Sequence, residues 1–152
     1  MITAHIPAGY ALAKSMRWTG AAFTAAIVGA VFPDIDLIWY FFIDDRLINH
    51  HRYWVHVPLF TVLASAILIV VTRRHPVAIA FAAGWTLHIL LDAPTGRLMW
   101  LWPVSNTLYA PIDVPPTRSH WILSFLTHWS VVFEVSIWAF AATLFVRRKQ
   151  VS

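Results

Sequence analysis

Apolar runs separated by short polar segments organise this chain. Four of them are predicted to be helices, at residues 18–32, 57–71, 77–91 and 121–146, and residues 3–16 form a shorter candidate. A helix needs about 20 apolar residues to cross a bilayer, and several of these runs come close to that length. The pattern therefore predicts an all-α fold, a polytopic helical membrane protein with about four spanning helices plus short or re-entrant helices.

Prolines and carboxylates mark the places where apolar runs end. Pro33 is predicted to stop the apolar run 21–32, and it precedes Asp34 and Asp36 and a further short apolar run, 37–43. Residues 93–120 hold five of the nine prolines, which predicts an ordered loop or a re-entrant segment. The start of the chain does not resemble a cleaved signal peptide. We expect residues 1–152 to form a single integral membrane domain.

Composition supports a lipid environment. Of the 152 residues, 59% are apolar and only 12% are charged, and the mean hydropathy is +0.66. Average soluble domains have about 45–50% apolar and about 25% charged residues. This balance excludes a soluble monomer and, more firmly, a disordered chain.

The distribution of basic residues predicts the orientation in the membrane. They form small groups at positions 14 and 17, 73 and 74, and 147–149, rather than the basic stripe of a nucleic-acid-binding protein. The positive-inside rule places these groups on the cytoplasmic side. The loops at 44–56 and 93–120 then share the opposite side with His5. Because the chain is apolar and its basic residues form no stripe, we expect it to bind membrane lipids and no nucleic acid.

Seven or eight ionisable side chains are expected at that outer end. Each costs roughly 2.5–3.5 kcal/mol to insert into a membrane unless it is paired or bound to a metal. A divalent cation would explain why they gather there. The candidates are His5, Asp34, Asp36, His50, His51, His56, His88 and Asp92.

The spacings of these residues suit metal ligation. His88 and Asp92 are four apart and project from one face of a helix, although a plain helical hydrogen bond explains that pair equally well. Asp34 and Asp36 are two apart and would point the same way in an extended turn. Without cysteine, imidazole and carboxylate favour Zn, Mn or Fe. More than four ligands indicates two or more ions, a frequent arrangement for phosphoester hydrolysis.

Other ionisable residues are interpreted differently. His75, in a basic turn, and His120 and His128 are expected to have structural roles. Asp44 and Asp45 are expected to be solvated loop charges. Glu134 stands in the middle of an apolar run, where it would pair with His128 or another buried group, or line a polar cavity.

Several short motifs follow one another along roughly residues 4–110. They are Ala4-His5, residues 31–36, 51–56 and 84–92, Thr95, Gly96 and Trp102-Pro103. Their identity and order resemble the YdjM (DUF457) family. That family comprises bacterial inner-membrane proteins described as LexA-regulated, membrane-bound, metal-dependent hydrolases, distantly related to zinc-dependent phospholipase C and S1/P1 nucleases.

This resemblance implies a metal-dependent hydrolase in the bacterial cytoplasmic membrane, with the metal site on the extracytoplasmic side. It assigns the ligand role to His5, Asp34, Asp36, His51, His56, His88 and Asp92. The chain departs from the family pattern beside two of these motifs, where Val55 and Val57 replace the usual Thr and Ser and Leu37 replaces a frequent His. Hydrogen bonds that orient the ligands would differ there, and His50 is an extra imidazole that could substitute.

The first functional hypothesis is hydrolysis of phosphoesters, with phospholipids among the candidate substrates. The metal would activate water, Asp34 or Asp36 would act as general base, and Arg52 or Arg97 would stabilise the developing charge. A rim of aromatic residues would admit a lipid headgroup. That rim comprises Trp100, Trp102 and Tyr109.

Two alternatives remain open. The chain could bind metal without catalysis or transport metal ions, and a trail of ionisable groups from His88 through Glu134 and His128 would favour transport. The motif could also be vestigial, in which case His88→Ala and Asp36→Ala would change neither metal content nor stability. The sequence does not give the oligomeric state.

Overall fold

Residues 3–149 are described by the structure, a computed structural model. Within them the fold is helical, and the one β-type feature is an isolated bridge between Leu98 and Tyr109. The all-α prediction is therefore confirmed for the described residues. The helices are α1 (His5–Ser15), α2 (Gly20–Val31), α3 (Leu37–Phe42), α4 (Pro58–Val71), α5 (Pro76–Asp92), α6 (Trp121–Leu126) and α7 (Val131–Lys149), with 3₁₀ turns η1 (Phe32–Asp36), η2 (His50–Arg52) and η3 (Trp54–His56).

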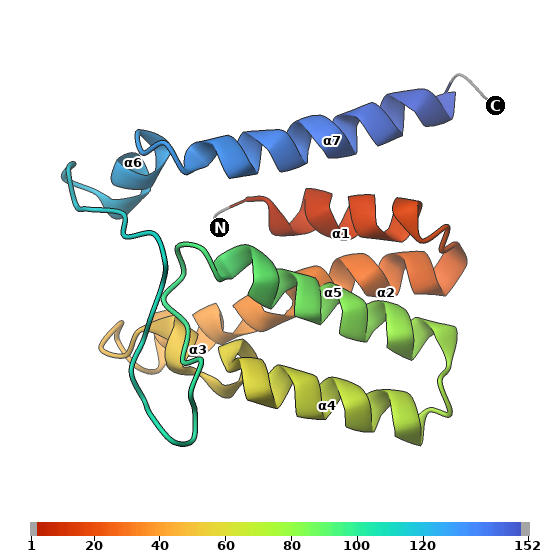
Figure 1. The fold of residues 1–152 in the computed structure, drawn as a ribbon, viewed down its shortest axis with the longest axis horizontal. Coiled ribbons are helices and arrows are strands. Elements are labelled where there is room, and N and C mark those ends of the chain that lie inside the picture. The colour runs from red at the N-terminus through yellow and green to blue at the C-terminus, as the bar shows by residue number, and fades with distance from the viewer. Residues whose placement is uncertain (1–2, 150–152) are drawn as a thin grey trace.

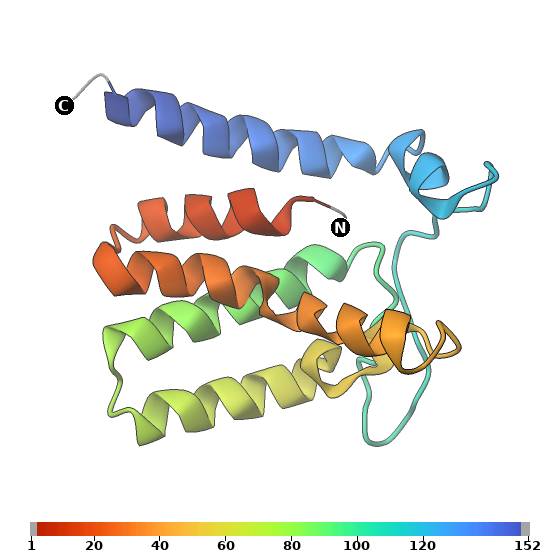
Figure 2. The same ribbon diagram turned by 180° about the vertical axis from the view of Figure 1, so that it is seen from behind.

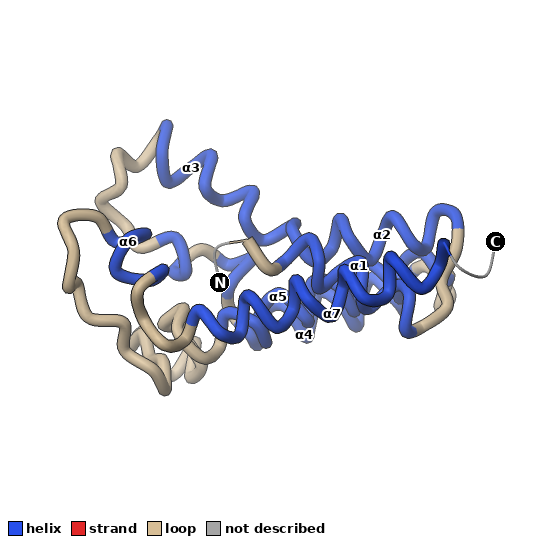
Figure 3. The backbone as a smooth tube through the Cα atoms, turned by 90° about the horizontal axis from the view of Figure 1, so that it is seen from above, coloured by secondary structure: helices blue, strands red, loops and turns tan. Residues whose placement is uncertain are grey.

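Five helices lie side by side with similar axis directions: α1, α2, α4, α5 and α7 (Figures 1 and 2). The α1–α2 and α4–α5 turns lie at one end of the row together with the end of α7, whose side chains at 148 and 149 are outside the described part. The long loops lie at the other end. Figure 3 shows α3 and α6 at that end too, with α3 leaving the row. The predicted grouping of basic turns at one end and long loops at the other is confirmed.

Small residues let the central helices approach closely. A Cβ atom on Gly84 of α5 would lie 2.2 Å from the carbonyl oxygen of Ala26 in α2. A Cβ on Gly29 would lie 2.1 Å from the carbonyl oxygen of Phe81. Glycine is required at both contacts, as is common where helices pack within membranes. This close packing brings His88, one turn beyond Gly84, next to Ala30 of α2.

Within residues 3–149, one helical stretch is long and apolar enough to cross a membrane. It runs from Gly20 to Phe42, 23 residues, and joins α2, η1 and α3. Helices α4 and α5 are apolar but shorter. Four spanning helices are thus not confirmed by length and composition.

The expected stop at Pro33 is confirmed for the α-helix, since α2 ends at Val31, but the helical path itself does not end there. Pro33 sits in the first turn of η1, where a missing N–H leaves no hydrogen bond unmade, so the chain continues helically through Asp36 into α3.

The predicted single helix at 121–146 was wrong, because it divides into α6 and α7. Thr127 Oγ1 donates to the carbonyl oxygen of Leu123, and the backbone N–H of Ser130 donates to His128 Nδ1. Such local bonds compete with helix continuation. The segment 93–120 is a loop, and Leu98 and Tyr109 exchange two backbone hydrogen bonds of 3.0 Å across it.

Candidate metal centre

His88 is oriented by the packing of α5 against α2. Its Nδ1 lies 2.8 Å from the carbonyl oxygen of Ala30, which can only accept, so Nδ1 carries the proton. Nε2 is therefore the ring nitrogen that faces the other ionisable side chains. The His88 side chain is fully buried, and its ring stacks on that of His5 with centroids 3.8 Å apart.

His56 reaches the same place from η3. Its Nδ1 lies 2.6 Å from Asp36 Oδ2, and its Nε2 lies 3.1 Å from His88 Nε2. A carboxylate behind a histidine fixes the ring and makes the far nitrogen a better ligand, a common arrangement in metal sites. Val55 and Val57, two departures from the family pattern, are buried beside His56. Their apolar side chains can neither donate to nor accept from His56.

Asp92, at the end of α5, connects most of the cluster. Its Oδ2 lies 3.2 Å from His88 Nε2, 3.5 Å from His51 Nε2 and 3.7 Å from His56 Nε2. Its Oδ1 lies 3.4 Å from His5 Nε2. The side chain is 2% exposed, so four imidazoles from three separate segments meet one buried carboxylate.

Asp34 and Asp36 diverge rather than pointing the same way. They belong to the 3₁₀ turn η1, in which each residue turns the chain by about 120°, so positions two apart lie on different faces. Asp36 is buried against His56, whereas Asp34 is 28% exposed and its Oδ1 lies 3.8 Å from His88 Nε2. The expectation of an extended turn was wrong, yet both carboxylates still reach the cluster.

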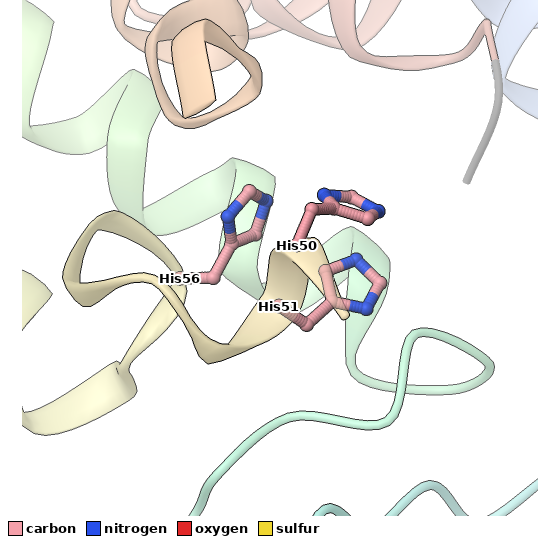
Figure 4. Close-up of side chains that lie close together, drawn as sticks. All are labelled: His50, His51 and His56. Carbon is pink, nitrogen blue, oxygen red and sulfur yellow. The ribbon is translucent and has the colours of Figure 1, made fainter. Parts of the chain in front are cut away.

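His50 and His51 complete the cluster from η2, as Figure 4 shows with His56. Their rings lie 4.0 Å apart. His50 Nδ1 lies 3.5 Å from Asp36 Oδ1, and both atoms are buried without forming a hydrogen bond. His50, the extra imidazole that was expected to be able to substitute, thus lies with the seven predicted ligands.

The separations between these atoms fit a bound metal ion. Ligand atoms about 2.1 Å from one tetrahedral ion lie about 3.4 Å from each other. His56 Nε2, His88 Nε2 and Asp92 Oδ2 are 3.1, 3.2 and 3.7 Å apart. Among the described residues, three groups have their candidate ligand atoms within 4.8 Å of one another, namely His56/His88/Asp92, His5/Asp34/His88 and His50/His51/His56.

Burial keeps two of the loop imidazoles neutral. It lowers the pKa of His51 from 6.5 to about 4, against the opposing effect of the Asp92 carboxylate. Burial likewise lowers the pKa of His56, partly offset by Asp36. A histidine must be neutral to bind a metal, so both are ready to act as ligands near neutral pH.

The two candidate cations lie outside the cluster's contacts. Arg52 follows His51 directly, but its guanidinium is exposed and donates to the backbone carbonyl of Asn106 over 3.4 Å. Arg97 forms an exposed ion pair with Asp113. In the described part of the chain, Arg97 is thus paired with a carboxylate and Arg52 is not.

The predicted aromatic rim divides between two pockets. Trp100 and Tyr109 line a groove of about 820 Å³ that begins at Ala93 and Pro94, immediately after Asp92. Trp102 lines a smaller pocket of about 110 Å³ together with Arg52.

The three remaining histidines have local structural roles, as expected. His75 Nδ1 accepts from Val77 N at the start of α5, and His120 Nδ1 accepts from Ile122 N at the start of α6. His128 bonds Ser130. Asp44 accepts from the Tyr53 hydroxyl, so the expectation of a simply solvated charge was wrong for it.

Glu134 does not pair with His128. Its Oε1 accepts from the backbone N–H groups of Thr3 and Ala4, 2.6 and 3.2 Å away, at the start of α1. Glu134 and His128 are therefore both engaged elsewhere, and the trail of ionisable groups that would favour transport is not formed by them.

Comparison with known proteins gives one match. The family model described as YdjM inner membrane protein matches residues 1–151. No curated protein and no solved structure matches the chain. The match extends beyond the motifs around the cluster and includes α6 and α7. The chain therefore belongs to the YdjM inner membrane protein family.

Proposed function

We propose that this protein is a membrane-bound, metal-dependent hydrolase of phosphoesters. The observation that carries the proposal is the buried triangle of His56 Nε2, His88 Nε2 and Asp92 Oδ2, whose sides of 3.1–3.7 Å match the spacing of ligands around one ion. The neighbouring groups around His5 and His50 support two or more ions, with zinc favoured and manganese or iron as alternatives.

Buried groups orient the ligands, and more exposed side chains take part in the reaction. Asp36 and the carbonyl of Ala30 orient His56 and His88 from behind. A divalent ion held there supplies an activated water and neutralises charge on a phosphoryl group. Asp34, the most exposed carboxylate of the cluster, is placed to accept a proton from that water. Arg52, which directly follows His51 in η2, supplies positive charge for the developing phosphorane.

The groove next to Asp92 favours a substrate with an apolar portion, such as a phospholipid. It is lined mainly by apolar side chains, among them Trp100 and Leu101, and Ala93 at its start follows Asp92. Leu101 and Val104 of the same loop are largely exposed. In an inner-membrane protein, such a loop is suited to lie at the lipid surface.

The disposition in the membrane is part of the proposal. Helices α2, α4, α5 and α7 span or nearly span the bilayer, with the turn at Arg73 and Arg74 on the cytoplasmic side. The metal centre then faces the extracytoplasmic side, where the loops gather in Figure 1.

Metal analysis followed by an activity assay tests the proposal. Detergent-purified protein, expressed with ample metal, should contain at least one equivalent of transition metal by inductively coupled plasma mass spectrometry. It should also hydrolyse bis-p-nitrophenyl phosphate or short-chain phosphatidylcholine in a chelator-sensitive manner. Less than one metal per chain overturns the proposal. Metal without hydrolysis of either substrate would identify a non-catalytic metal protein, and uptake of metal into proteoliposomes would identify a transporter.

A further inference from the structure

We propose that Glu134 of α7 is a positioning residue for the metal centre, acting through the first turn of α1 on His5. The inference rests on the metal site of the proposed function. It concerns a residue outside the motifs that carry the ligands. Glu134 and His5 are on helices that lie alongside one another, as Figure 1 shows for α1 and α7.

The contact between the two helices is specific. Glu134 is 4% exposed, and its Oε1 accepts the backbone N–H of Thr3 at 2.6 Å and that of Ala4 at 3.2 Å. One turn further along α7, Trp138 Nε1 donates to Thr3 Oγ1 over 3.1 Å. Three hydrogen bonds therefore fasten the two residues that precede His5 to one face of α7.

Helix α1 needs this partner because its own sequence provides no cap. The first N–H groups of a helix have no acceptor within the helix. Ala4 is the N-cap residue and has no side-chain acceptor, and the first turn of α1 contains no acidic residue. The Glu134 carboxylate accepts the N–H of the N-cap residue Ala4 and of Thr3 before it, and so caps α1 from outside by placing a negative charge at the positive end of the helix dipole.

His5 is the first residue of α1, so the position of this cap decides where its ring lies. The ring stacks on His88 with centroids 3.8 Å apart, and Nε2 lies 3.4 Å from Asp92 Oδ1. The rest of α1 is held independently, since Gly9 packs against Ala30 and Ile27 of α2. Loss of the cap is therefore expected to displace the first turn and His5 without detaching the helix.

The cost of burying a carboxylate argues that Glu134 has a specific role. It is surrounded in sequence by Phe133 and Val135 and is the one charged residue of the described α7 before Arg147. A buried charge is costly unless it is paired or hydrogen-bonded. An apolar side chain would serve packing better, whereas only an acceptor can cap α1.

Metal affinity provides the test. Three variants are compared with the wild type in Co²⁺ titrations against a chelating dye and in Co²⁺ absorption spectra: Glu134→Leu, Glu134→Gln and Ser136→Ala. Substitutions that disturb ligand orientation weaken metal binding by about 10–100-fold. We expect at least about a tenfold loss and an altered spectrum for Glu134→Leu, and a smaller loss for Glu134→Gln, whose amide oxygen can still accept. Ser136→Ala, at an exposed position on the same helix, should match the wild type.

A double variant separates positioning from general destabilisation. If Glu134 acts through His5, Glu134→Leu combined with His5→Ala should bind Co²⁺ no more weakly than His5→Ala alone. An additive loss, or an unchanged affinity in both Glu134 variants, overturns the inference. If Glu134→Leu fails to fold, Glu134→Gln and its combination with His5→Ala decide in the same way. A wild type that binds no metal would instead defeat the proposed function and this inference together, whereas absence of hydrolysis alone would leave the inference standing.

Discussion

His56 and His88 face each other through their Nε2 atoms, 3.1 Å apart, while the Nδ1 of each is held from behind. The carboxylate of Asp36 lies against His56 Nδ1, and the carbonyl oxygen of Ala30 lies against His88 Nδ1. When both rings are neutral and carry their proton on Nδ1, the two Nε2 lone pairs point into one buried space, where they repel. A cation shared by the two nitrogens removes that repulsion, and Asp92 supplies the negative charge beside it.

Replacing either histidine should therefore remove bound metal. We expect His88→Ala and His56→Ala each to retain less than about a tenth of the wild-type metal content after dialysis against a weak chelator. The measurement is inductively coupled plasma mass spectrometry on detergent-purified protein. His75→Ala is the matched control, because His75 caps the opposite end of α5 through Val77 N. Metal content that is equal in all three variants would mean that the cluster is vestigial.

Asp36→Asn should weaken metal binding without abolishing it. The asparagine keeps the size of the side chain and an oxygen that can accept from His56 Nδ1, but it loses the charge that makes Nε2 a stronger ligand. It also leaves one fewer carboxylate oxygen opposite His50 Nδ1. A loss in affinity of about 10–100-fold is expected. Isothermal titration with Zn²⁺ measures this loss of affinity. An affinity equal to that of the wild type would mean that Asp36 contributes to metal binding neither through His56 nor beside His50.

The sequence predicts α1, α2, α4 and α5 to within two residues at each end, because long apolar runs and short basic turns leave few arrangements. The turn at Arg73 and Arg74 is too short for anything but antiparallel neighbours, so α4 and α5 must bring His56 and His88 to the same end. That argument needs no side-chain geometry. It is the reason that His56 and His88 lie together in the structure.

Features that depend on local hydrogen bonds or on distant contacts could not be predicted. The divergence of Asp34 and Asp36 follows from the 3₁₀ geometry after Pro33, which packing selects over an extended turn. The break between α6 and α7 depends on bonds made by Thr127 and His128. The partner of Glu134 lies 130 positions away in sequence, and no spacing rule reaches that far.

Gly96→Ala should disturb the metal centre directly. An added Cβ would lie 2.7 Å from the carbonyl oxygen of Asp92 and 3.0 Å from His51 Cε1, so one of these two candidate ligands must shift. We expect about a tenfold loss of Zn²⁺ affinity together with roughly 1–3 kcal/mol of destabilisation. Gly20→Ala provides the contrast. Its φ of +53° makes alanine strained, but no atom lies within 4 Å of the new Cβ, so stability should fall while affinity remains.

Gly84→Ala should destabilise the whole helix row. The new Cβ would lie 2.2 Å from the carbonyl oxygen of Ala26, and neither backbone can give way without separating α2 from α5. Overpacking of this kind costs about 1–3 kcal/mol or more. Thermal unfolding in detergent measures the effect, with Ala66→Leu on the exposed side of α4 as the control. A Gly84→Ala protein as stable as the control would contradict the close approach of the two helices.

The metal-free protein should lose stability as the pH falls below about 6.5. Burial lowers the pKa of His51 to about 4 in the folded chain, whereas in the unfolded chain it titrates near 6.5. Between pH 4 and 6.5 His51 binds a proton in the unfolded chain but not in the folded one, so acid favours unfolding. The contribution of neutral His51 to the free energy of unfolding is therefore complete only above the higher of these two pKa values. For His51 alone, lowering the pH from about 7.5 to about 5.5 costs roughly 1 kcal/mol, or about 2–4 °C in Tm. Thermal unfolding of chelator-treated wild type should show that fall, and His51→Gln, which has no imidazole to protonate, should show a fall smaller by that amount. The same slope in both proteins would mean that His51 is not protected from protonation in the folded state.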